Sequence, residues 1–157
     1  MTADDLLKMS KDELDDLFSK SPPGDIPEGD TDGTAIIAAG TKYSSSIAKF
    51  VSYFAWQGKV FKPDKKDPTR STLRNKLTML GFEAIVAQVY KDKSLHDGKE
   101  CIVLDYSETS TVAGWIRDEL RQVQPGLYLG KVYGHANKPL IHFALEVLAK
   151  NQPPIQS

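Results

Sequence analysis

The chain has 157 residues, of which 40% are hydrophobic and 26% are charged, and its formal net charge at pH 7 is −1. This composition is typical of a single globular domain and excludes a collagen-like, low-complexity or wholly disordered chain. No apolar run approaches the roughly 20 residues that cross a bilayer, and the N-terminus lacks an apolar signal segment, so we expect a cytoplasmic protein without a membrane span. One cysteine, Cys101, excludes a disulfide framework and a cysteine zinc site.

Charge is distributed unevenly along the chain. Residues 1–33 contain ten Asp and Glu against three Lys, a balance of −7, so the remaining residues carry about +6. Residues 59–76 form a basic patch with seven Lys and Arg and two Asp. This patch fits a phosphate, another anionic ligand, the chain's own acidic N-terminus or a solvated loop. Nucleic-acid binding is not expected, because such proteins usually have a strongly basic domain with interleaved aromatic residues.

The chain begins with a predicted helix within residues 4–20. Ser10-x-x-Glu13 is a capping box, and Met9 and Leu14 have the spacing of a hydrophobic staple. The apolar stripe of this helix is narrow, so we expect the helix to lie on the surface of the domain.

The next segment, residues 21–33, is rich in proline and glycine, which disfavours regular structure and indicates a linker or wrapping arm. Three regions are therefore predicted. Residues 1–33 form an acidic helix and arm, residues 34–150 form one antiparallel-sheet domain, and residues 151–157 form a frayed tail.

Short runs with β-type hydrophobicity, separated by turn residues, follow the arm. They predict strands at residues 34–39, 58–62, 71–77, 83–92, 99–107, 127–133 and 140–149. Residues 139–149 also contain good helix formers, so both strand and helix stay open there. Asp97-Gly98 predicts a tight hairpin. Helical spacing predicts two further helices, at residues 42–55 and 109–124.

Strands joined by short turns must be antiparallel, because a parallel connection needs a crossover of a dozen or more residues. The expected fold class is therefore α+β. We predict a strongly curved antiparallel sheet or a partly closed, lipocalin-like β-barrel of about six strands, with the aromatic helix at 42–55 covering one face or one mouth.

Many of the fourteen aromatic residues lie on these strands or on the covering helix. This fits either a filled core or a barrel that encloses a small hydrophobic or amphipathic ligand. An arginine after Trp115 would either anchor a carboxylate or phosphate head group or join an ion-pair network with its neighbouring carboxylates. The candidate ligand-binding residues are Phe54, Trp56, Tyr106, Trp115, Arg117, Arg121 and Tyr128.

An alternative function is a cofactor-free isomerase, cyclase or lyase that uses acid–base residues in the same cavity. Period-two alternation encloses either Asp105 or Tyr106, and it places His142 on the face away from its apolar neighbours. The catalytic candidates are Asp105, Tyr106, Glu119 and His142. We expect no metal and no cofactor, because the histidines lack ligand spacing and glycine-rich phosphate motifs are absent. A second alternative is an interaction protein with a solid core.

Four segments together resemble a set of small bacterial proteins: residues 56–61, 97–106, 115–119 and 125–130. The resemblance spans about residues 34–148 and implies no specific activity. In architecture the chain is also similar to the calycins, the lipocalin and fatty-acid-binding barrels, which implies an antiparallel barrel around an apolar ligand. The lipocalin Gly-x-Trp motif appears here only as Trp56-Gln-Gly, and a predicted helix interrupts the late strands.

Overall fold

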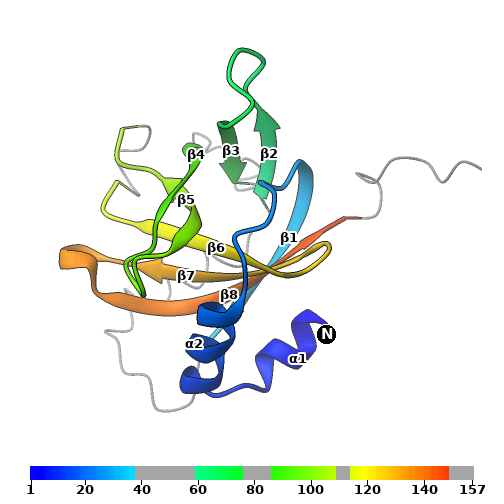
Figure 1. Cartoon of the computed structure of the whole chain (residues 1–157), viewed down its shortest axis with the longest axis vertical. Coiled ribbons are helices and arrows are strands. Elements are labelled where there is room, and N and C mark those ends of the chain that lie inside the picture. Colours follow the sequence, from blue (N-terminus) through cyan, green and yellow to red (C-terminus); the bar gives the residue numbers. More distant parts are fainter. Residues whose placement is uncertain (38–58, 76–85, 109–113, 149–157) are drawn as a thin grey trace, which may run out of the picture.

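The computed structural model describes residues 1–37, 59–75, 86–108 and 114–148. Within these ranges, eight antiparallel strands follow one another around a closed barrel, and β8 pairs with β1 to complete it (Figure 1). The strands are β1 (Gly29–Ile36), β2 (Lys59–Pro63), β3 (Ser71–Asn75), β4 (Val86–Lys93), β5 (Glu100–Asp105), β6 (Arg117–Gln124), β7 (Leu127–Tyr133) and β8 (Pro139–Val147).

The expected antiparallel barrel is confirmed, but the predicted number of about six strands is wrong. Part of the predicted helix at 109–124 is instead strand β6, which pairs with β5 and β7. Its Arg, Glu, Leu and Gln are good helix formers, yet Leu120 packs in the barrel core while Arg121 and Glu119 find partners on the outer wall. Tertiary contacts therefore override local helix propensity here.

The structure also shows where β1 begins and that residues 139–147 form a strand. Strand β1 begins at Gly29, inside the segment expected to be irregular, because Gly29 and Asp30 pair with β2 and residues 31–36 pair with β8. The open question at 139–149 is answered by β8, which is a strand. The predicted aromatic helix at 42–55 lies outside the described residues.

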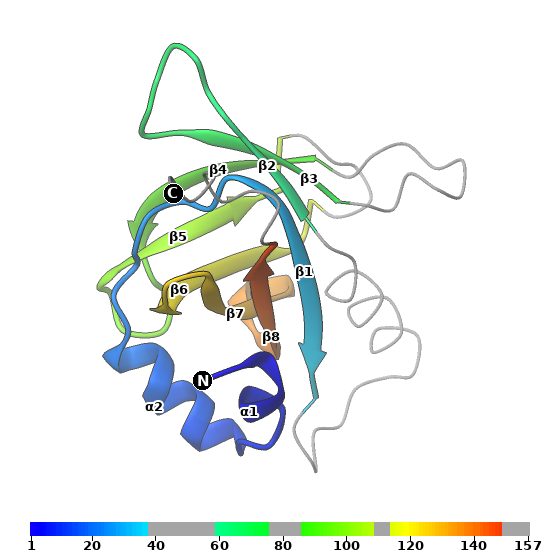
Figure 2. The ribbon, with the colours of Figure 1, turned by 90° about the vertical axis from the view of Figure 1, so that its right-hand side faces the viewer.

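The barrel wall separates two apolar clusters. The inner cluster lies inside the barrel and includes Phe61, Leu104, Tyr106, Tyr128 and Phe143. The outer cluster lies between the wall and two N-terminal helices, α1 (Ala3–Leu7) and α2 (Lys11–Lys20). Figure 2 shows both helices against the same side of the barrel. All seven residues of β7 are buried, because both of its faces are covered.

The predicted start of helix α2 is confirmed. Ser10 caps the helix, and its side chain and that of Glu13 form the reciprocal capping box. Leu14 and Phe18 are fully buried in the outer cluster. The helix therefore contributes its apolar stripe to the outer wall, where it also brings polar groups of its other turns close to β6, β7 and β8.

Because β1 begins at Gly29, the arm itself consists of residues 21–28, which lead from α2 past the barrel to β1 (Figure 2). The amide of Gln122 donates to the carbonyl of Pro22 at 2.9 Å, and the Tyr128 hydroxyl donates to the carbonyl of Asp25 at 2.5 Å. Ile26 packs against the inner cluster. The arm is therefore attached to β6 and β7 and covers part of the barrel end near the turn that joins them.

Candidate functional site

A buried polar cluster lies inside the barrel. Lys59 on β2 and Asp118 on β6 have 0% and 1% of their surface exposed. The Tyr106 hydroxyl, just after β5, donates to Asp118 Oδ2 at 3.2 Å. Thr31 on β1 holds the backbone of Lys59, since its hydroxyl donates to the Lys59 carbonyl at 2.7 Å and accepts from the Lys59 amide at 3.2 Å. Four strands thus position an amine, a carboxyl group and a phenol within the apolar core.

Burial perturbs both charged groups of this cluster. It lowers the pKa of Lys59 to about 8, although the negative charge of Asp118 acts in the opposite direction. It raises the pKa of Asp118 to about 6, against the opposing effects of Lys59 and the Tyr106 hydrogen bond. Asp118 Oδ1 is buried and has no hydrogen-bond partner among the described residues. Such an oxygen marks a place where a water molecule or a polar ligand group would be stabilised.

A pocket with a volume of about 660 Å³ lies where the arm approaches the β2–β3 hairpin and β4. Its apolar walls are supplied by three prolines, Ile26 and the ring of Tyr90, and its donors include Arg70, Ser71 and Lys91. The complete lining is Asp25, Ile26, Pro27, Glu28, Pro63, Pro68, Thr69, Arg70, Ser71, Tyr90 and Lys91. Residues of the acidic arm and of the predicted basic patch therefore line the same pocket.

The guanidinium of Arg70 has a defined position in the pocket. It lies over the Tyr90 ring, 5.0 Å from the centroid, and Nη2 donates to Gln88 Oε1 at 3.2 Å. Such stacking leaves other guanidinium N–H groups able to bind an anion in the ring plane. Tyr90 is itself oriented by a 2.8 Å hydrogen bond from its hydroxyl to Asp105 Oδ2.

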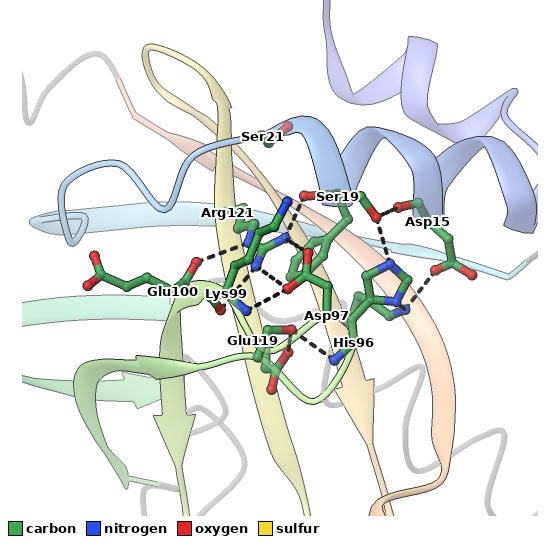
Figure 3. Close-up of polar contacts among 12 residues, drawn as sticks. Asp15, Ser19, Ser21, His96, Asp97, Lys99, Glu100, Glu119 and Arg121 are labelled. Atoms are coloured by element: carbon green, nitrogen blue, oxygen red, sulfur yellow. Dashed lines mark hydrogen bonds and ion pairs between the residues drawn. The ribbon is translucent and has the colours of Figure 1, made fainter.

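A second polar cluster lies on the outer wall, between α2, the β4–β5 turn and β6 (Figure 3). Arg121 is 1% exposed and forms two hydrogen bonds of 2.7 Å with the carboxylate of Asp97. Its guanidinium carbon lies 4.5 Å from the centroid of the Phe18 ring. Glu119 accepts from the Ser94 hydroxyl at 2.6 Å and from Arg117 Nε at 3.0 Å. These contacts attach the turn and α2 to the barrel.

Ser19 and His96 approach closely in this cluster, with Ser19 Oγ 2.7 Å from His96 Nε2 (Figure 3). Lys131 Nζ lies 3.1 Å from His96 Nδ1, and because an ammonium group can only donate, Nδ1 must accept and Nε2 carries the proton. Nε2 therefore donates to Ser19, whose own hydroxyl donates to the Asp15 carbonyl at 2.9 Å. A histidine that donates to Ser19 does not activate it as a nucleophile.

The ligand-binding candidates fall on both sides of the barrel wall. Tyr106 and Tyr128 belong to the inner cluster, and Trp115 packs against it. Arg117 and Arg121 lie on the outer wall, where they pair with Glu119 and Asp97. The two arginines therefore do not face the aromatic residues with which they were grouped. Phe54 and Trp56 lie outside the described residues.

The acid–base candidates are likewise not assembled into one site. Of Asp105 and Tyr106, Tyr106 is the enclosed residue, with 0% exposure. Asp105 accepts hydrogen bonds from Tyr90 and Ser107, and Glu119 accepts from Ser94. His142 lies beneath α2, with Nε2 2.9 Å from Asp15 Oδ1.

Sequence reasoning missed Lys59 and Asp118 as partners. Lys59 alternates with Phe61 on a predicted strand, and this period-two relation is a signal that the lysine points inward. Asp118 gave no such signal, because residues 109–124 were interpreted as a helix. The pocket residues Arg70 and Lys91 are distant in sequence from the arm, and only the fold places them beside it.

Comparison with protein-family models, with curated proteins and with solved structures gave no match. The described ranges contain no group of three His, Cys, Asp or Glu side chains arranged to hold a metal ion. Among the helices in those ranges, none has the length and apolar character needed to cross a membrane. We therefore infer the function from the geometry of the pocket and of the polar cluster inside the barrel.

Proposed function

We propose that the protein binds a small amphipathic molecule with an anionic head group in the pocket between the arm and the β2–β3 hairpin. The observation that carries this proposal is the pocket of about 660 Å³ that combines apolar walls with Arg70 and Lys91. Pockets of about 300–1,000 Å³ with a few convergent polar groups are typical of small-molecule sites. Ile26 and the prolines would contact the apolar part of the ligand.

The charges around the pocket favour an anionic head group on the hairpin side. The two carboxylates of the hairpin already accept local hydrogen bonds, Asp64 from the Lys66 amide and Asp67 from Thr69. Arg70 presents a planar set of donors, which suits a carboxylate. Asp25 and Glu28 on the arm would disfavour a second negative charge on the opposite wall and would accept from ligand hydroxyl groups.

Calorimetric titration with decanoate and with the uncharged decanol tests this proposal. Arg70→Gln should weaken decanoate binding about tenfold, as expected for the loss of one charge-assisted interaction, and should leave decanol binding almost unchanged. Arg74→Gln is the matched control, because Arg74 is an exposed arginine on β3, the strand that begins directly after Arg70, and it does not line the pocket.

Two results would overturn the proposal. One is the absence of both calorimetric binding and a thermal shift across a series of carboxylates of different chain length. The other is an equal effect of Arg70→Gln and Arg74→Gln, which would show that decanoate responds to overall charge rather than to the pocket.

A further inference from the structure

The inner polar cluster has a chemistry that the proposed ligand pocket does not use. Lys59 presents a primary amine inside the barrel, with Nζ 5.6 Å from the centroid of the Phe143 ring. Asp118, which shares this interior, carries a buried oxygen without a hydrogen-bond partner among the described residues. An amine and a proton-donating carboxyl group in an apolar environment are the groups that condensation with a carbonyl compound requires.

We infer that Lys59 is a site of imine formation with a small apolar aldehyde or ketone, and that Asp118 transfers the protons of this reaction. The lysine amine attacks the carbonyl carbon, a C–N bond forms, and the Asp118 carboxyl group protonates the carbonyl oxygen. The nitrogen then returns one proton to the Asp118 carboxylate, which gives the neutral carbinolamine. Asp118 next protonates the hydroxyl group, which leaves as water when the C–O bond breaks, and takes the remaining nitrogen proton to give the imine. The net reaction joins amine and aldehyde with release of one water molecule and needs no oxidant or reductant.

The fold supports each role in this reaction. The two hydrogen bonds between Thr31 and the backbone of Lys59 fix the base of the lysine on the inner wall. The Tyr106 hydroxyl donates to Oδ2 of Asp118 at 3.2 Å, whereas Oδ1 is buried and has no hydrogen-bond partner among the described residues. The surrounding apolar side chains favour a neutral amine and an apolar carbonyl compound over charged competitors.

Reactivity should distinguish Lys59 from exposed lysines. With a pKa of about 8 instead of 10.5, the neutral fraction of Lys59 near pH 7 is about two orders of magnitude larger than that of an exposed lysine. Because the neutral amine is the nucleophile, limiting propanal with cyanoborohydride should alkylate Lys59 well before the exposed lysines. Lys62, exposed on the same strand, is the internal reference.

The experiment is peptide mapping of the full-length protein after short exposure to propanal and cyanoborohydride near pH 7. We expect the propyl group on Lys59 at least tenfold above Lys62. Lys59→Met should abolish that modification, and Lys62→Met should not change it. Asp118→Asn removes the charge that raises the pKa of Lys59 and so enlarges the neutral fraction of the amine, but loss of the proton transfer should still slow the labelling of Lys59 at least tenfold while leaving that of Lys62 unchanged.

The inference is wrong if Lys59 is labelled no faster than Lys62, or is not labelled at all. It is also wrong if Asp118→Asn folds normally by circular dichroism and leaves the labelling rate of Lys59 unchanged. Wild-type peptide mapping decides the first point even if a variant fails to fold. Binding of decanoate in the arm pocket does not involve Lys59, so the two proposals succeed or fail separately.

Discussion

Gly130 on β7 shows how closely single residues are fitted in the barrel. A Cβ atom at this position would lie 2.3 Å from the ring of Phe143, which is fully buried. The aromatic ring therefore occupies the volume that any side chain at position 130 would need. Such a contact cannot be relieved by rotation of an exposed side chain, so overpacking is the expected consequence of substitution.

We predict that Gly130→Ala lowers the free energy of unfolding by about 2–3 kcal/mol. Gly98→Ala is the comparison. Gly98 has φ +73° but open space around its Cβ position, so its substitution should cost about 1 kcal/mol from backbone strain alone. Urea denaturation measures both values. An equal or smaller effect at Gly130 would contradict the packing argument.

Arg121 is a buried cation that joins the β4–β5 turn and α2 to the barrel. Its side chain is 1% exposed and forms an ion pair with Asp97, and its Nη1 donates to the Phe18 carbonyl at 2.9 Å. The same pairing lowers the pKa of Asp97 to about 2.

Arg121→Met should lower the free energy of unfolding by about 3 kcal/mol, because it leaves buried acceptors unsatisfied. Lys20→Met, which breaks an exposed ion pair with Asp16, should cost less than about 0.5 kcal/mol in the same assay. Similar effects of the two variants would contradict this assignment.

At the scale of elements, α2 is attached to the barrel by groups that titrate. Asp15 accepts from Lys131 at 2.7 Å and contacts His142 at 2.9 Å, while His96 lies between Ser19 and Lys131. Burial is the main cause that lowers the pKa of both His96 and His142. Burial opposes ionisation of Asp15, but hydrogen bonds from Lys11, Lys131 and His142 outweigh it and lower the pKa of that carboxyl group.

These shifts predict that attachment of α2 weakens on acidification. The unfolded chain binds protons at its histidines below about pH 6.5 while the folded chain still excludes them, so stability falls as pH falls through this range. Protonated His96 would also place its charge 3.1 Å from the Lys131 ammonium and close to Arg121, while Asp15 and Asp97 act in the opposite direction. The contribution of Asp15 to stability is lost in a separate, more acidic range, as pH falls below about 3.8 towards the pKa of Asp15 in the folded chain.

Hydrogen exchange of the α2 amides, corrected for intrinsic rates, measures this effect between about pH 7.5 and 5.5. Protection should fall on acidification, and His96→Gln should reduce the fall, because glutamine can still donate to Ser19 and accept from Lys131 without titrating. His135→Gln is the control, since His135 is exposed and stacks on Trp115. An unchanged pH dependence in His96→Gln would contradict the role given to His96.

At the scale of the whole molecule, the barrel and the helices form two layers. The strand ladder closes between β1 and β8 without hydrogen bonds from α1 or α2. The helices instead cover the outer cluster, which includes Cys101, Val103 and Leu129. Burial raises the pKa of the Cys101 thiol to about 12, so the full-length protein should protect its only cysteine.

Deletion of residues 1–20 should therefore leave a folded but less stable barrel with a reactive Cys101. We expect β-type circular dichroism to persist and the rate of thiol labelling to rise at least tenfold, because the covering side chains of Leu14 and Phe18 are removed. Leu7→Ala in the full-length chain is the control, since Leu7 is an exposed residue of α1. Loss of β-structure in the deletion variant would show that the two layers fold as one.

The sequence alone determined the local features of this protein. Antiparallel pairing followed from short turns, the start of α2 followed from Ser10 and Glu13, and β7 was predicted with its observed bounds. These features depend on interactions between residues close in the chain, so their signals are local.

Only the tertiary structure decided that residues 117–124 form a strand, that the barrel closes and which residues meet in its polar sites. Residues 117–124 form β6 because long-range pairing with β5 and β7 outweighs the local helix propensity. Lys59 and Asp118 share one interior, and Arg70 lies across a pocket from Asp25, through contacts between strands and segments far apart in the sequence. Such contacts depend on register and closure, which no local pattern encodes.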